Sequence, residues 1–556
     1  MTDPDSPAAR DTEVSNPMDT VFDADVLVIG AGPTGLTSAS LLADQGLTVI
    51  LVEKHTGTTD EPRAISITDE TLRVMAQIGI MDRLAPEMLM DTGSRYFGRR
   101  GQLLAEVHPG TPTLGHPRKS QFDQPVLEKL LLDAARGRPN IDLRFDTETV
   151  AITNHDAYAD IEVVDPTGTG NIRTRWVVAC DGGKSPTRSQ LGIEMEGSTQ
   201  VEKWIVIDIV GAEEHERFAD FHCNGTRPGV VVPGVEGRCR FEFMLLPGES
   251  EQDMITPAAI DELLRPLVGR PVRPADIRRA AVYVAHQRIA LDYRRGRVLL
   301  AGDAAHLMPP FAGQGLNAGI RDAANLAWKV ASDVEGHGTG ALIGTYQTER
   351  RPHAAQMVKL SHRIGRIVMS TSPVVTIIRD ALITASGVVP AAKRWITAMK
   401  FLRQPHFTTG CVVPPAPALP SSVAYLVGRS LPQPVVTLAD ETTVPLDSVL
   451  GDGWSLLRFP IDADGAVEIV RLGGPASSSY DIASKATVVH DPTGAFPPST
   501  DRPFTLIVRP DHYVAAAYTP DREHDVLTAL AAFVPGLADT STHLPESRFG
   551  TTTTNH

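Results

Sequence analysis

The segment that most restricts the fold is a short apolar run followed at once by closely spaced glycines. Residues 25–30 read DVLVIG, the pattern of a buried strand, and Gly30, Gly32 and Gly35 follow in the spacing G-x-G-x-x-G. Glycine permits the tight turn that this spacing needs and lets a backbone approach a bound phosphate closely. The spacing alone is a weak signal, so its meaning depends on what comes next in the chain.

The residues after the glycines complete a strand–helix–strand unit. A helix is expected over 34–45 and a second apolar strand over 48–52, which ends at Glu53. The helix N-terminus suits a pyrophosphate, and the carboxylate can accept hydrogen bonds from both ribose hydroxyls. The unit therefore predicts an α/β fold that binds a dinucleotide. An acid at the ribose disfavours a 2'-phosphate, so FAD or NAD is expected before NADP.

A second stretch that suits a bound ligand lies at 297–329 and reads RVLLAGDAAHLMPPFAGQGLNAGIRDAANLAWK. Its apolar run 298–301 ends at Gly302-Asp303, and a loop of prolines and glycines leads into a helix from about Leu316. The Asp303 carboxylate can accept hydrogen bonds from sugar hydroxyls, and the helix N-terminus suits the anionic edge of a reduced flavin. Taken alone, the stretch fits equally well an ordinary strand, loop and helix.

Two further polar positions are ambiguous. Arg63 lies in a loop, and Gln124 stands at the start of a helix expected over 125–135. Arg63 fits a solvated position as well as a contact with a pyrophosphate, an isoalloxazine or a nicotinamide. Gln124 has the same two possible roles, solvated residue or ligand contact, and the local sequence does not distinguish them for either residue.

Composition argues against several classes of function. The chain of 556 residues has a net charge of -15 and no extended Lys/Arg cluster, which argues against a nucleic-acid or anionic membrane surface. Its four cysteines lie far apart without C-x-x-C, which argues against a zinc site or disulfides and favours a cytoplasmic compartment. No apolar run is long enough to predict a membrane span, and the first residues lack the order of a signal peptide.

Changes in residue pattern and composition along the chain predict several domains. Alternating segments after residue 200 predict an inserted antiparallel sheet that covers a substrate, and the last strands suggest a thioredoxin-like domain without C-x-x-C. Basic residues on helices over 345–383, including Arg350, are expected to be solvated. The expected parts are a disordered tail at 1–20, the FAD-binding domain at 21–200 and 291–404, the substrate domain at 201–290, a proline-rich linker at 405–434 and the thioredoxin-like domain at 435–556.

Together these features resemble the group A flavoprotein aromatic monooxygenases of the p-hydroxybenzoate hydroxylase fold. The resemblance rests on the G-x-G-x-x-G unit, a strand ending in DGG and the stretch GDAAHLMPPFAGQGLN before a helix. Within that class, DEPRAIS at 60–66, CDGGKSPTR at 180–188, RFEFMLLPGE at 240–249 and VRPDHYVAA at 508–516 are most similar to 3-(3-hydroxyphenyl)propionate hydroxylases. Relatives with the same plan act on resorcinols, nitrocatechols and polyketides, so the substrate stays open among these.

The resemblance implies that FAD is bound non-covalently and that NADH or NADPH binds only transiently as a co-substrate. It implies that reduced flavin adds O2 to form a C4a-hydroperoxide, which hydroxylates a phenolic acid ortho to an existing hydroxyl. Pro310 stands where a backbone carbonyl can border the phenol. The implied FAD contacts are Gly30, Gly32, Pro33, Gly35, Glu53 and Lys54 at the ADP half, Arg63 and Gln124 beside the pyrophosphate and ribityl chain, Asp303 on the ribityl hydroxyls, and Gly313, Gly315, Leu316 and Asn317 at the flavin N1/O2 edge.

Three residues of the expected substrate sheet are candidates for substrate contacts: His222, Arg227 and Arg240. A buried substrate carboxylate needs a cationic partner, and Arg227 is the first choice because arginine binds carboxylates in a bidentate way. His222 could assist deprotonation of the phenol, since a histidine ordinarily titrates near neutrality. Each residue also fits a structural role, the arginines as solvated sheet residues and the histidine packed beside a strand.

Two other classes of protein compete with a hydroxylase. One is a reductase or halogenase of the same fold, although the W-x-W-x-I motif of such halogenases is absent from the sequence. The other is a binding protein that kept an inert flavin fold, against which the intact glycines and acids argue. Because the C-terminal domain lacks C-x-x-C, it is expected to be structural or to support a homodimer.

Overall fold

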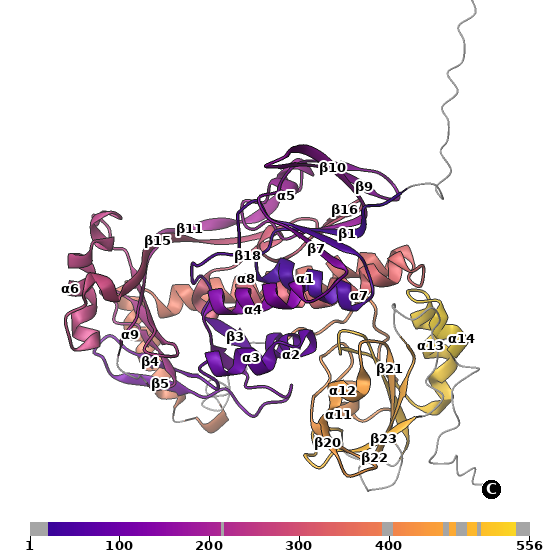
Figure 1. The fold of residues 1–556 in the computed structure, drawn as a ribbon. Helices are drawn as coiled ribbons and strands as arrows, with labels where there is room; N and C mark the ends of the chain where they lie inside the picture. The colour runs from indigo at the N-terminus through magenta and orange to yellow at the C-terminus, as the bar shows by residue number, and fades with distance from the viewer. Residues whose placement is uncertain are drawn as a thin grey trace, which may run out of the picture.

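A computed structural model gives the fold and describes residues 21–212, 216–387, 389–391, 404–459, 466–473, 486–497 and 502–540. The tail expected at 1–20 lies outside the described residues. Three large sheets divide the molecule (Figure 1): a mainly parallel one, a long antiparallel one beside it and a separate one near the C-terminus.

The parallel sheet confirms the nucleotide fold predicted from the sequence. Its central strands are buried on both faces, so apolar side chains fill successive positions. The carboxyl ends of the parallel strands meet at one edge, where α/β folds bind ligands. The sheet runs β16-β17-β10-β1-β2-β7, with bounds Arg294–Arg295, Val298–Leu300, Gly168–Ala179, Ala24–Ile29, Val49–Val52 and Ile141–Arg144, and is extended by β8 (Glu148–Asn154) and β9 (Ala159–Asp165). Helix α1 (Pro33–Asp44) follows β1 in the chain, and α4 (Gln124–Arg136) follows β6 (Lys119–Gln121).

The long antiparallel sheet presents one face to helix α6 (Pro257–Val268). Ile205, Ile207 and Phe241 form a common core with residues of that helix, so the alternate side chains of the same strands face the nucleotide domain. Strands β4 and β5 come from residues 93–107 and lie outside the 201–290 expected for this sheet. The order is β18-β15-β11-β14-β13-β12-β4-β5, with bounds His306–Leu307, Ile277–Ala290, Met195–Ile209, Cys239–Met244, Gly229–Pro233, Phe218–His222, Gly93–Phe97 and Leu103–Val107.

Helices α7 (Gly315–Val334), α8 (Gly340–Val368) and α9 (Pro373–Ser386) follow the parallel sheet. The expectation of a solvated basic face is wrong for Arg350 of α8, which is buried and ion-paired with Asp322 of α7. A guanidinium in the interior requires such a carboxylate partner. In the described part of the chain no single helix is long and apolar enough to cross a membrane; α8 and α9 meet that test only as a pair bent by 103°.

The C-terminal domain is a seven-stranded sheet with α13 (Glu523–Ala531) in the same core. The stretch expected as a linker is part of this domain, because Leu419, Val423 and Leu431 are buried in its core. Trp328 of α7 packs edge-on against Trp454, so the domain shares a core with the nucleotide domain. The sheet runs β20-β19-β23-β22-β21-β24-β25, with bounds Thr443–Pro445, Val435–Leu438, Thr487–His490, Ala466–Arg471, Ser455–Phe459, Phe504–Val508 and Val514–Tyr518.

Candidate active site

A cavity of ≈ 1110 Å³ lies between the carboxyl edge of the parallel sheet, the loop before α7 and the inner face of the long antiparallel sheet. Of the cofactor-site residues predicted from the sequence, all except Gly35 and Asn317 line it. Residues far apart in the chain, such as Glu53, Asp303 and Glu242, therefore share one space.

The glycine turn forms one end of the cavity. A Cβ on Gly35 would lie 1.9 Å from the Gly30 carbonyl oxygen, and one on Gly30, whose φ is +102°, would lie 2.6 Å from the Cys180 carbonyl oxygen. Packing within the turn therefore requires both glycines. At Gly32 a Cβ would meet no atom within 4 Å, and no side chain caps α1 at this position. Gly32 thus leaves an open cradle beside free helix N–H groups, which fits a pyrophosphate.

Glu53 stands beside this turn at the end of β2. Its carboxylate accepts hydrogen bonds from the backbone N–H groups of Ala31 (2.9 Å) and His55 (3.0 Å). These contacts fix the side chain, and a carboxylate has further lone pairs with which to accept hydroxyl groups. Lys54, the next residue, is exposed at the edge of the cavity.

Gln124 and Arg63 behave differently. The Gln124 side chain accepts from the Ala64 N–H (2.6 Å) and donates to Glu128 (2.7 Å), so it holds the loop that carries Arg63. The Arg63 guanidinium is 68% exposed and lies 3.7 Å from Glu61, while its backbone carbonyl accepts a hydrogen bond from Arg240. The loop is thus fixed, whereas the Arg63 side chain can turn toward a ligand.

Asp303 follows β17 and faces the cavity from a short 3-10 turn, Gly302–Ala304. Among the described residues none donates a hydrogen bond to its carboxylate, and the residue is exposed to the cavity. Desolvation by the surrounding protein nevertheless raises its pKa, against the opposing charges of His306 and Arg63. A carboxylate placed in this way fits the hydroxyls of a ribityl chain.

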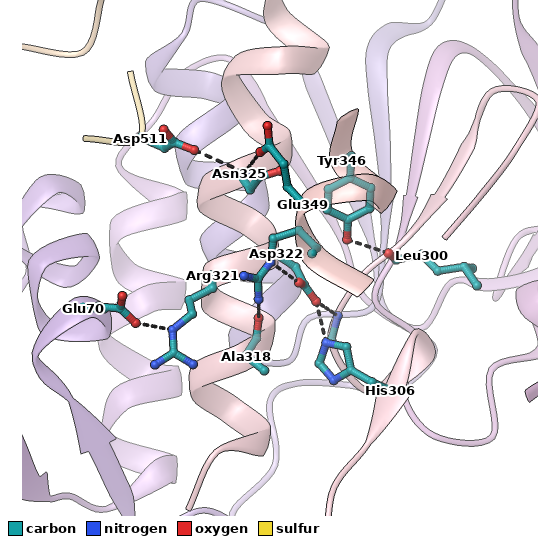
Figure 2. A network of polar contacts seen from close by, with 12 residues as sticks. Glu70, Leu300, His306, Ala318, Arg321, Asp322, Asn325, Tyr346, Glu349 and Asp511 are labelled. Atoms are coloured by element: carbon teal, nitrogen blue, oxygen red, sulfur yellow. Dashed lines mark hydrogen bonds and ion pairs between the residues drawn. The ribbon is translucent and has the colours of Figure 1, made fainter. Parts of the chain in front are cut away.

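The backbone beneath Asp303 is fixed by a buried network that joins α7 and α8 (Figure 2). Asp322 accepts from the Gly302 N–H (3.1 Å), from His306 Nε2 (2.7 Å) and from Arg350 Nε (2.8 Å). Arg350 and His306 hold the pKa of Asp322 low against its burial. Asp322 therefore ties the turn under Asp303 to both helices.

The loop before α7 is shaped by Gly313 and braced by Asn317. Gly313 adopts a left-handed φ of +60°, which favours glycine. Asn317 accepts from the Thr68 N–H (3.0 Å) and donates to the Gly313 carbonyl (2.7 Å). Its side chain is therefore structural, and only its backbone N–H, in the first turn of α7, is available to a ligand.

The inner face of the antiparallel sheet forms the far wall. Neighbouring strands align Ser94 with Ala219 and Tyr96 with Phe221, and Phe221 with Val230. The wall is mainly apolar and faces Pro310 and Phe311 across the same cavity. Two polar residues of this wall have hydrogen-bond partners within the sheet. Arg240 donates to Asp208 (2.7 Å), and Glu242 accepts from the Tyr283 hydroxyl (2.9 Å).

Two predicted substrate residues lie elsewhere. Arg227 is not among the cavity residues, since its guanidinium forms an ion pair with Glu249 and donates to the Met244 carbonyl (3.1 Å). His222 is also absent from the cavity wall and stacks on Phe97 at 5.4 Å, where burial lowers its pKa. The structure therefore brings neither side chain to the cavity. Arg240 does line the cavity, but its pairing with Asp208 makes it part of the wall.

Sequence reasoning missed four polar residues of the cavity: Ser94 and Tyr96 on β4, Lys119 at the start of β6 (Lys119–Gln121), and Arg118 just before it. These strands are short and pair with segments far away in the chain. The alternation of Ser94 and Tyr96 is the one local signal for them, and it covers too few residues to define a strand.

Comparison with known proteins identifies both parts of this architecture. Residues 23–361 match the FAD binding domain family, and residues 428–533 match the HcaD C-terminal domain. Curated relatives named 3-(3-hydroxy-phenyl)propionate/3-hydroxycinnamic acid hydroxylase include one from Mycolicibacterium smegmatis, 35% identical over 91% of this chain and 92% of that protein. One from Mycobacterium sp. is 36% identical over 91% of each chain.

Solved structures share the fold. Aklavinone-11 hydroxylase, in a complex with FAD and aklavinone, has a TM-score of 0.72 at 24% identity and covers 94% of this chain and 100% of its own. The OxyS anhydrotetracycline hydroxylase of Streptomyces rimosus has a TM-score of 0.71 at 25% identity and covers 92% and 99%. With the family model spanning most of the chain, this protein belongs to the FAD-dependent aromatic monooxygenases.

Proposed function

We propose that this enzyme uses NAD(P)H and O2 to hydroxylate a phenol with a short carboxylate side chain, ortho to an existing hydroxyl. The best candidate is 3-(3-hydroxyphenyl)propionate, which the names of the curated relatives support. One observation carries the proposal: a single cavity joins the glycine turn and Asp303 to an apolar wall opposite Pro310. A resorcinol, nitrocatechol or polyketide is the alternative substrate, and a non-catalytic binding protein is the alternative class.

We assign FAD binding to the residues that the family motifs and the cavity bring together. Gly30, Gly32 and Gly35 shape the turn for the pyrophosphate, Glu53 accepts the adenosine ribose hydroxyls and Asp303 accepts the ribityl hydroxyls. Bound FAD supplies the redox and oxygen chemistry, which no side chain of the protein can perform. The remaining assigned contacts are Pro33, Lys54, Arg63, Gln124, Gly313, Gly315, Leu316 and Asn317.

The protein's own part is to position the phenol and exclude water. The Pro310 carbonyl accepts one hydrogen bond, from the Gly313 N–H (2.8 Å), and its second lone pair is free to accept the hydroxyl of a phenol. The apolar side chains of the opposite wall exclude water from the ring. Pro310 is thus the residue we place nearest the reacting ring.

Oxidation of NADH and of NADPH by purified protein, measured over a panel of phenols with identification of the products, tests this function. We expect a yellow protein that releases FAD on denaturation and forms 3-(2,3-dihydroxyphenyl)propionate. A protein that binds FAD but forms no hydroxylated product from any phenol would favour the non-catalytic class. The homodimer stays a prediction, which light scattering of the full chain tests.

A further inference from the structure

We propose that Lys119 is the residue that binds the side-chain carboxylate of the substrate. The inference rests on the proposed function and names the anionic subsite of the same cavity. It replaces Arg227, which lies outside the cavity and is neutralised by Glu249.

The contacts of Lys119 leave its charge without a counter-ion. Its Nζ donates to Ser94 Oγ (2.8 Å) and to the Gly93 carbonyl (3.4 Å), and both acceptors are neutral. Among the described residues no carboxylate lies within ion-pairing distance of Nζ. An ammonium has three donors, so at least one remains for a ligand. A cation enclosed by protein gains strongly from an anionic partner.

Two arginines that line the cavity already have carboxylate partners. Arg240 is paired with Asp208, and Arg321 is paired with Glu70. These two arginines therefore have their carboxylates within the protein. Lys119 differs from these two arginines because its contacts with Ser94 and Gly93 orient the ammonium without neutralising it.

The position of Lys119 also suits the substrate. Lys119 is the first residue of β6, and its hydrogen bond to Ser94 holds its ammonium beside β4, one of the strands of the apolar wall. The same face carries Tyr96 and Phe221, which stack at 4.8 Å and line the cavity together with Phe311. An aromatic ring on this wall can direct a short flexible arm to Lys119 while its hydroxyl faces Pro310.

The test compares Lys119→Met, Lys119→Gln and Lys119→Arg with wild type. Binding of 3-(3-hydroxyphenyl)propionate and of its uncharged primary amide is followed by the change in flavin absorbance, and kcat and KM are measured for both. Losing a charged hydrogen bond should raise Kd and KM for the acid roughly 10- to 100-fold in the first two variants. The amide should change by less than about 3-fold, and arginine should retain most of the affinity for the acid.

Lys203→Met is the matched control. Lys203 belongs to β11 of the long antiparallel sheet, is 44% exposed, is paired with Glu251 and lies outside the cavity lining, so its loss should affect neither ligand. If Lys119→Met disturbs the fold, Lys119→Gln still tests the assignment, because the glutamine amide can donate a hydrogen bond to Ser94 without carrying a charge. Equal losses on acid and amide, or loss of FAD in place of substrate, would overturn the assignment while leaving the proposed function intact. A wild type that hydroxylates neither compound would instead remove the proposed function, and the assignment with it.

Discussion

Gly32 and Gly35 stand three positions apart, yet an added methyl group would meet different surroundings at each. At Gly35 it would overlap the Gly30 carbonyl, 1.9 Å away, whereas at Gly32 it would meet no protein atom within 4 Å. We expect Gly35→Ala to lower the free energy of unfolding of the FAD-free protein by at least about 1–3 kcal/mol. Gly32→Ala should leave that stability nearly unchanged and weaken FAD binding, because the methyl group occupies space needed by the pyrophosphate. Urea unfolding and FAD titration measure the two effects, and equal stability of both variants would contradict the argument.

The carboxylate of Asp303 has a role that can be separated from folding. Because the residue is exposed to the cavity and no described residue donates a hydrogen bond to its carboxylate, its removal should not destabilise the FAD-free protein. We expect Asp303→Ala to raise the Kd for FAD roughly 10- to 100-fold, through loss of charged hydrogen bonds to the ribityl chain. Turnover should return when FAD is supplied in excess. Full FAD affinity with lost turnover would instead show a proton-transfer role.

Asp322 of α7 accepts hydrogen bonds from Gly302, His306 and Arg350, and its ion pair with Arg350 connects α7 to α8. We expect Asp322→Ala to lower the free energy of unfolding by about 3–5 kcal/mol, because it leaves the buried Arg350 guanidinium uncompensated. Urea unfolding measures the change. Asp142→Ala is the control, since its ion pair with Arg144 is exposed and its loss should leave the free energy of unfolding nearly unchanged.

The sequence predicts long, periodic elements well and short ones poorly. The strand–glycine–helix unit at Gly30 and the strand before Asp303 carry their own turn residues and apolar runs, so both were predicted. Strands β4 and β6 hold five and three residues, and each is stabilised by a partner far away in the chain. Lys119 was missed for that reason.

Individual side chains are harder still to place. An arginine in a loop carries no local sign of the carboxylate that will meet it, which is why Arg227 was expected at the substrate and lies against Glu249. Arg350 was expected in solvent because helical spacing alone does not reveal Asp322 on another helix. Tertiary partners, not local pattern, decide such positions.

The whole molecule is joined by a second buried network between α8 and the C-terminal domain. Glu349 lies between Lys329 and Arg509, and all three side chains are fully buried. Burial opposes ionisation, but Arg509 and Lys329 hold the pKa of Glu349 down to about 2, below its ordinary value of 4.5. Its stabilising contribution is thus complete above about pH 4.5 and is lost as the pH falls toward about 2.

We therefore expect Glu349→Gln to lower the melting temperature at neutral pH, with a deficit that shrinks as the pH falls through this range. Thermal melts of both proteins across the acid range measure the deficit. A deficit that stays constant with pH would contradict the proposed charge interaction.

Helix α7 has one end at the cavity and its other half in the core shared with the C-terminal domain. Its first turn borders the cavity, while Asn325 donates to Glu349 (2.8 Å) and to Asp511 (3.3 Å) of the β24–β25 turn. A ligand that orders the first turn must therefore also restrain opening of a hairpin that it does not touch. We expect amide hydrogen exchange in β24 and β25 to slow when FAD binds, and unchanged exchange there would show that the two ends of α7 open independently.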